Sequence, residues 1–91
     1  MSATLVLPGV LREHAGGRRT LPVRGATVRE VLDRLAVDWP ALERRLRDEQ
    51  GGLRPHVLIF VDGLNVRDAL GLETAVPEGA ELYVAPAVSG G

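Results

Sequence analysis

The chain has 91 residues, 45% of them hydrophobic and 25% charged, which predicts a single small globular domain with one core. Its net charge is −1 with acidic and basic residues interspersed, so no basic stripe predicts binding to nucleic acid, and the absence of cysteine excludes disulfides and thiol chemistry. The longest apolar run, residues 57–61, is far shorter than the roughly 18 residues that span a bilayer, and the first residues lack the pattern of a secretory signal, so we expect a cytoplasmic protein that binds no membrane.

Alternating apolar residues predict an opening strand over residues 4–10. The Gly16-Gly17 pair predicts a turn, after which residues 18–23 return as a second, antiparallel strand. His14 stands beside this turn without another metal ligand at a matching spacing. We therefore expect His14 at the surface or in a capping role, and we expect no metal site.

The next segment has the pattern of an amphipathic helix that begins after Thr27 and continues to about residue 38. Thr27 and Glu30 have the spacing of a capping box, in which both side chains satisfy backbone N–H groups at the start of a helix. Pro40 predicts the end of this helix, because the residue before a proline avoids the helical conformation. Residues 41–47 are expected to form a second, shorter helix whose arginines face solvent.

The second half of the chain contains the most hydrophobic predicted strand, residues 56–61. Asp62-Gly63 follows it and is typical of a hairpin turn, so residues 65–67 are predicted as a short return strand. Residues 70–76 have no regular pattern. Residues 81–85 alternate again and predict the last strand.

This order of elements predicts an α+β fold, a mixed sheet with one main helix packed across one face. The first and last strands would lie side by side and parallel. Alternation then turns Tyr83 and Ala85 away from the helix, next to Phe60 and Leu58 of the apolar strand. An exposed apolar face of this kind is a candidate partner surface, although a covered central strand would have the same sequence.

The C-terminal residues 86–91 are predicted to form a flexible tail on a domain of residues 1–85, and this tail ends in Gly90-Gly91. Two glycines at a given place occur by chance in roughly one chain in 200. Without a Cβ they form a thin backbone that enters narrow channels. The carboxylate of Gly91 is therefore the candidate reactive group, and a partner would recognise the residues before it: Pro86, Val88, Ser89 and Gly90.

The predicted β-grasp architecture and the terminal diglycine resemble the ubiquitin-like sulfur carriers of the ThiS/MoaD family, and within it the CysO type. The resemblance covers nearly the whole chain, with Ser89 as a small departure where alanine is common. It is carried by these residues: Leu11-Arg12, His14, Gly16-Gly17, Gly25, Thr27, Pro40, Arg45-Leu46, Leu53-Arg54, Phe60-Val61, Val66-Arg67, Gly71-Leu72, Thr74, Pro86-Ala87-Val88 and Gly90-Gly91.

The resemblance implies that the protein is a sulfur donor acted on by enzymes rather than an enzyme, and that it binds no cofactor itself. A ubiquitin-activating-type adenylating enzyme, MoeB- or ThiF-like, would use Mg-ATP to adenylate Gly91, and a sulfur source would convert the adenylate into a thiocarboxylate. The acceptor would be held by a PLP-dependent cysteine synthase, or by a thiazole or thiosugar synthase. A carrier that visits several partners is expected to be a monomer.

Three alternatives remain open at this point. The chain would be the small subunit of molybdopterin synthase if it forms a tight complex with a large subunit. It would be a ubiquitin-like modifier if Gly91 becomes attached to lysines of other proteins; because all eleven basic residues are arginine, its own side chains offer no amine as an acceptor. It would be a plain binding module if the diglycine is incidental.

Overall fold

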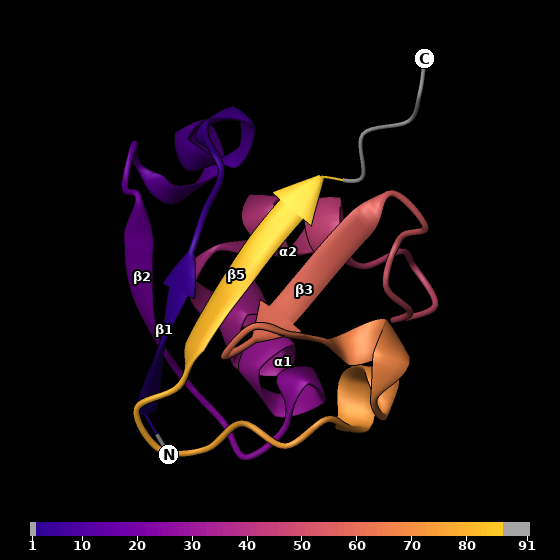
Figure 1. The fold of residues 1–91 in the computed structure, drawn as a ribbon. Helices are drawn as coiled ribbons and strands as arrows, with labels where there is room; N and C mark the ends of the chain where they lie inside the picture. Colours follow the sequence, from indigo (N-terminus) through magenta and orange to yellow (C-terminus); the bar gives the residue numbers. More distant parts are fainter. Residues whose placement is uncertain (1, 87–91) are drawn as a thin grey trace.

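The computed structural model describes residues 2–86, which form a five-stranded mixed sheet in the order β2-β1-β5-β3-β4, with both α-helices behind one face (Figure 1). The strands are β1 (Ser2–Val6), β2 (Thr20–Arg24), β3 (Val57–Val61), β4 (Leu64–Asn65) and β5 (Glu81–Pro86). The α-helices are α1 (Val28–Asp38) and α2 (Pro40–Leu46), and the 3-10 helices are η1 (Gly9–Ala15), η2 (Val66–Asp68) and η3 (Gly71–Glu73).

The first and last strands lie side by side in the sheet, where β1 and β5 run parallel with Leu5 in register with Leu82. On either side, β2 pairs antiparallel with β1, and β3 pairs antiparallel with β5. Leu5, Leu82 and Ile59 are fully buried beneath the helices. The predicted β-grasp arrangement, with parallel first and last strands, is confirmed.

Helix α1 begins at the predicted cap. The Thr27 hydroxyl oxygen accepts a hydrogen bond from the Glu30 backbone N–H at 3.2 Å, and the Glu30 carboxylate accepts one from the backbone N–H of Ala26 at 3.0 Å. These bonds satisfy donors that the helix itself leaves without partners. The apolar side of the helix, which packs on the sheet, is fully or almost fully buried and consists of Val28, Val31, Leu32 and Leu35.

The predicted strand over residues 4–10 is wrong beyond Val6. Pro8 has no N–H to donate to a strand pairing, and the chain turns into the 3-10 helix η1 at Gly9. This helix ends at Gly16, which adopts the left-handed conformation with φ 63°. β1 and β2 are therefore an antiparallel pair joined by a helical connection rather than by a tight turn, and β2 starts at Thr20.

Two further predicted segments differ from the structure. A return strand was expected at residues 65–67, but β4 already ends at Asn65. The Asn65 side chain accepts a hydrogen bond from the Arg67 N–H at 2.9 Å and starts η2 instead. Residues 71–73 form η3 within the segment expected to be irregular. Both helices are single turns, too short to show a hydrophobic period.

Arg47 also departs from the prediction that the arginines of the second helix face solvent. Its side chain is 8% exposed and donates to Asp33 of α1 at 2.8 Å and to Glu43 of α2 at 2.7 Å. Burial alone lowers the pKa of Arg47, but the hydrogen bonds and charges of the two carboxylates raise it, and the net pKa lies above its usual value. Arg47 is thus a buried link between the two helices.

Candidate functional site

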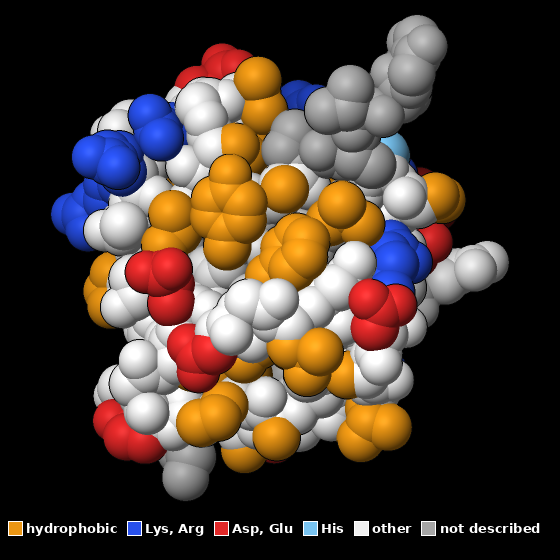
Figure 2. Space-filling view, viewed as in Figure 1, with side chains coloured by type: hydrophobic (Ala, Val, Ile, Leu, Met, Phe, Trp, Pro, Cys, Tyr) orange, Lys and Arg blue, Asp and Glu red, His pale blue; other side chains and the backbone are white. Residues whose placement is uncertain are grey.

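The face of the sheet opposite the helices carries the four residues predicted as a partner surface. In the pairing of β3 with β5, Leu58 lies opposite Ala85 and Phe60 lies opposite Tyr83. Tyr83 is 42% exposed and the other three are half-buried. Hydrophobic side chains gather in the middle of this face (Figure 2). We call these four residues, together with Val6, the exposed sheet face.

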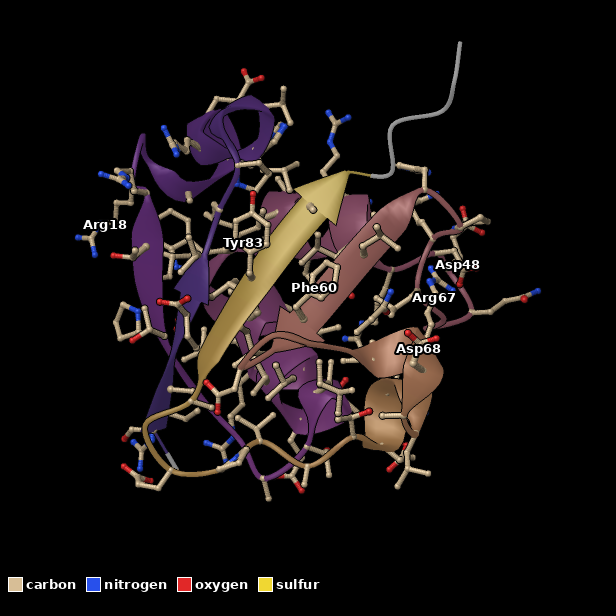
Figure 3. All side chains as sticks on the ribbon, viewed as in Figure 1. Arg18, Asp48, Phe60, Arg67, Asp68 and Tyr83 are labelled. Atoms are coloured by element: carbon tan, nitrogen blue, oxygen red, sulfur yellow. The ribbon has the colours of Figure 1, made fainter. Side chains whose placement is uncertain are left out.

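The centre of this face is an aromatic pair. The rings of Phe60 and Tyr83 have centroids 6.4 Å apart and are tilted by 42°, within the range of favourable aromatic contacts (Figure 3). Val6 of β1 is in register with Tyr83 on its other side and extends the apolar surface. The predicted partner surface did not include Val6, although alternation along the first strand places Val6 on the outer face together with Thr4.

The strand that leads to the predicted reactive end lies inside the sheet, between β1 and β3. It extends one residue past Ala85, to Pro86, which is in register with Val57. The chain therefore leaves the sheet beside the exposed sheet face. The remaining predicted tail residues, Val88, Ser89, Gly90 and Gly91, lie outside the described residues.

A groove borders the end of β5 on the helix side. It is lined by His14 of η1, Arg45 of α2, His56, and the strand residues Val84 and Ala85. His14 is half-buried here rather than fully at the surface. In the part of the chain that the structure describes, no three His, Cys, Asp or Glu side chains are placed to hold a metal ion, and no helix is long and apolar enough to cross a membrane.

Comparison with known proteins identifies the family. The model of the ThiS family matches residues 5–91, nearly the whole chain. The chain belongs to the ThiS family. The sulfur carrier protein CysO of Mycobacterium tuberculosis is 34% identical over 93 residues, which cover 100% of both chains. Small archaeal modifier protein 1 of Haloferax volcanii is 40% identical over 83 residues, covering 89% of this chain and 91% of the relative.

Solved structures agree with this assignment. A chain in the crystal structure of the BexX/CysO complex of Amycolatopsis orientalis superposes with a TM-score of 0.89 at 35% identity, covering 98% of this chain and 99% of that one. The β-grasp fold and the resemblance to the CysO type of this family, both predicted from the sequence, are confirmed. The relatives similar to this chain thus include a sulfur carrier protein and a small archaeal modifier protein.

Proposed function

We propose that the protein carries sulfur as a thiocarboxylate on the C-terminal carboxyl group of Gly91. The observation that carries the proposal is the Gly90-Gly91 sequence a few residues beyond Pro86, where β5 leaves the sheet beside an exposed apolar face. Membership of the ThiS family and full-length similarity to a sulfur carrier protein support it. Because the last two residues are glycines without a Cβ, the chain next to the reactive carbonyl of Gly91 is narrow enough to enter a partner's active site.

The chemistry requires activation, because a carboxylate does not expel oxide. In the first step a carboxylate oxygen attacks the α-phosphorus of Mg-ATP, and pyrophosphate leaves with the acyl-adenylate formed. In the second step a sulfide sulfur attacks the acyl carbon and AMP leaves with the former carboxylate oxygen. Loss of a proton from sulfur leaves the thiocarboxylate, so both steps balance without an oxidant or reductant. The ATP and its magnesium ion belong to the partner enzyme.

The exposed sheet face is the surface we propose for the adenylating enzyme of the MoeB or ThiF type. Phe60 and Tyr83 together offer a rigid, partly exposed aromatic contact. Aromatic side chains are enriched among the residues that contribute most to binding. A docked partner on this face would also lie next to the point where the chain leaves β5.

The decisive experiment is intact-protein mass spectrometry after incubation with Mg-ATP, sulfide and a candidate adenylating enzyme from the same cell. We expect a mass gain equal to the exchange of one oxygen for one sulfur. A chain lacking Gly91 is the control and should gain no mass. If a folded, full-length chain gains no sulfur with any adenylating enzyme of that cell, the proposal is wrong and a plain binding module becomes the better hypothesis.

The acceptor we propose is an aminoacrylate held by a PLP-dependent cysteine synthase, since the Mycobacterium tuberculosis relative is named CysO. Nucleophilic addition of the thiocarboxylate sulfur to the aminoacrylate β-carbon would give a thioester between Gly91 and the new cysteine, and hydrolysis of this acyl bond by water would release cysteine and restore the Gly91 carboxylate. Purified thiocarboxylate protein should yield the protein–cysteine adduct with this synthase, and free cysteine after hydrolysis. Transfer to a thiazole or thiosugar synthase alone would assign another pathway.

A second function is supported by the similarity to small archaeal modifier protein 1. The same activated Gly91 carbonyl would be attacked by a lysine amine of another protein instead of by sulfide. Conjugates of higher mass on denaturing gels, absent when Gly91 is deleted, would establish this function. Because the chain has no lysine, such conjugates would not extend into chains through its side chains.

A further inference from the structure

A cluster of basic side chains borders the groove at the end of β5. One surface hollow is lined by Arg44 and Arg45 of α2 together with Arg54 and His56 of the segment before β3. We call these four residues the basic cluster. Arg45 and His56 also line the groove that reaches Val84 and Ala85. The basic cluster is therefore continuous with the strand from which the chain leaves the sheet.

The three arginines of the basic cluster form no ion pair with residues 2–86, although Glu43, Asp48 and Glu49 line a neighbouring hollow together with Arg44 and Arg54. The ion pairs of this part of the chain join Arg29 to Glu73 and Arg47 to Asp33 and Glu43. No described carboxylate lies within ion-pairing distance of the three cluster arginines. Positive groups gathered around one hollow repel one another, and a negatively charged ligand would relieve this repulsion.

Hydrogen bonds hold the backbone of the cluster in place. The Arg54 Nε donates to the Arg44 carbonyl at 2.8 Å, and the Arg54 backbone N–H donates to the Leu46 carbonyl at 3.0 Å. One guanidinium nitrogen of Arg67 donates hydrogen bonds to the carbonyls of Arg54 and Val57, at 2.8 and 2.9 Å. The segment before β3 is thus tied both to the end of α2 and to η2.

Helix capping explains only part of this arrangement. Arginines near a helix C-terminus satisfy its last carbonyls and its negative dipole end, and Arg54 does so through its Nε. Among the described residues, the Arg44 and Arg45 side chains form no hydrogen bond or ion pair, and both are exposed. A single cap does not require these two additional cations.

We propose that the basic cluster binds an acidic segment of the enzyme that acts on the tail; the identity of that partner rests on the proposed function. Specific interfaces combine an apolar centre with a polar rim, and the basic cluster reaches the exposed sheet face at Ala85, through the groove that Arg45 and His56 also line. A single small anion on exposed arginines gains little over water. A segment with several carboxylates contacts all of them at once, with the paired geometry that guanidinium groups favour.

This contact would act mainly on the rate of encounter, because complementary surface charge accelerates association and salt screens it. The kinetic test uses Arg44→Gln/Arg45→Gln with the adenylating enzyme that loads the chain. We expect kcat/KM for loading to fall roughly tenfold at low ionic strength, kcat to stay unchanged, and the difference to shrink as salt is added.

The matched control is Arg18→Gln/Arg19→Gln, which removes the same charge from two exposed arginines before β2. Arg18 lies at the edge of the sheet away from Arg67 (Figure 3). The control should load at the wild-type rate at every salt concentration. Equal losses in the two double variants would assign the effect to net charge and overturn the proposal.

A second test needs no enzyme, so it separates this proposal from the sulfur-carrier function. NMR spectra of the full chain are recorded with a hexaglutamate peptide and, separately, with pyrophosphate. The peptide should shift signals of the basic cluster saturably in the wild type and in the Arg18/Arg19 variant, but not in the Arg44/Arg45 variant. Absence of these shifts, or tighter binding of pyrophosphate at the same residues, would overturn an acidic protein segment as the ligand.

Discussion

At the scale of the single residue, Gly25 is a position where the fold leaves no space for a side chain. A Cβ at this position would lie 2.7 Å from the Val31 backbone nitrogen and 2.9 Å from the Glu30 Cβ. These atoms belong to the first turn of α1, which the Thr27 cap holds in place. We expect Gly25→Ala to lower the free energy of unfolding by about 2 kcal/mol, and the melting temperature by roughly 10 °C, in thermal and urea unfolding.

Gly9→Ala provides the control for this prediction. Gly9 begins η1, and no atom lies within 4 Å of the Cβ it would gain. Its substitution should change the free energy of unfolding by no more than about 0.5 kcal/mol. Similar losses for both variants would show that the contact with α1 is not the reason why residue 25 is a glycine.

Single residues also show where sequence reasoning succeeds and where it stops. Tyr83 was predicted to face outward, and this is correct because alternation follows from strand geometry alone, which also buries the neighbouring Leu82. Gly25 was named only among the residues that resemble the ThiS/MoaD family, since the clash of a Cβ at this position depends on how α1 folds back over the strand. Arg47 was predicted in solvent because its partner Asp33 is 14 residues away, although the i,i+4 spacing of Glu43 and Arg47 favours a pair within the helix.

At the scale of the element, α2 is joined to α1 through Arg47. The two carboxylates that bind its guanidinium differ in exposure: the Glu43 side chain is 15% exposed and that of Asp33 is 60%. Water therefore replaces the contact of Arg47 with Asp33 far more readily than its contact with Glu43. We expect Glu43→Gln to lower the free energy of unfolding by about 1–3 kcal/mol, measured by urea denaturation.

Asp33→Asn is the isosteric comparison for the Glu43→Gln variant. An exposed ion pair contributes roughly 0.2–1 kcal/mol, so this variant should lose clearly less stability than Glu43→Gln. The opposite ranking would mean that the contact of Arg47 with Asp33 is the stronger one despite its exposure. No loss for either variant would mean that apolar contacts of Leu42 and Leu46, both fully buried, hold α2 without help from Arg47.

α1 and β3, the elements with the strongest apolar patterns, were predicted best. α1 has a clear helical period and β3 is a continuous apolar run, and the structure confirms both to within one residue. The helical connection η1 was mistaken for the end of a strand and a turn. Seven residues without a regular apolar pattern do not distinguish these possibilities, and the choice is made by the lack of an N–H at Pro8 and by packing of Ala15 in the core.

At the scale of the whole molecule, the helices cover one face of the sheet and leave the other open next to the end of β5 (Figures 1 and 2). Family membership and the open face together support a surface for partner proteins. Strand alternation predicted which residues form this face, but it did not predict that the face is uncovered. That depends on both helices packing on the same side, which is a property of the assembled fold.

This open face leads to the prediction that binding and stability separate at Tyr83. With 42% of its surface exposed, Tyr83 contributes little to the core, so Tyr83→Ser should unfold near the wild-type temperature. A central aromatic contact typically contributes at least about 2 kcal/mol to an interface. We therefore expect Tyr83→Ser to raise the Kd for the adenylating enzyme roughly 30-fold, measured by calorimetry.

Val37→Ser is the counterpart on the other side of the molecule, where Val37 of α1 is 80% exposed. It also removes an exposed apolar side chain, so a general loss of surface hydrophobicity would weaken binding in both variants. If only Tyr83→Ser binds weakly, the enzyme docks on the exposed sheet face. If Val37→Ser is the weaker binder, the partner approaches over α1, and the open face of the sheet must serve another protein than the one that loads Gly91.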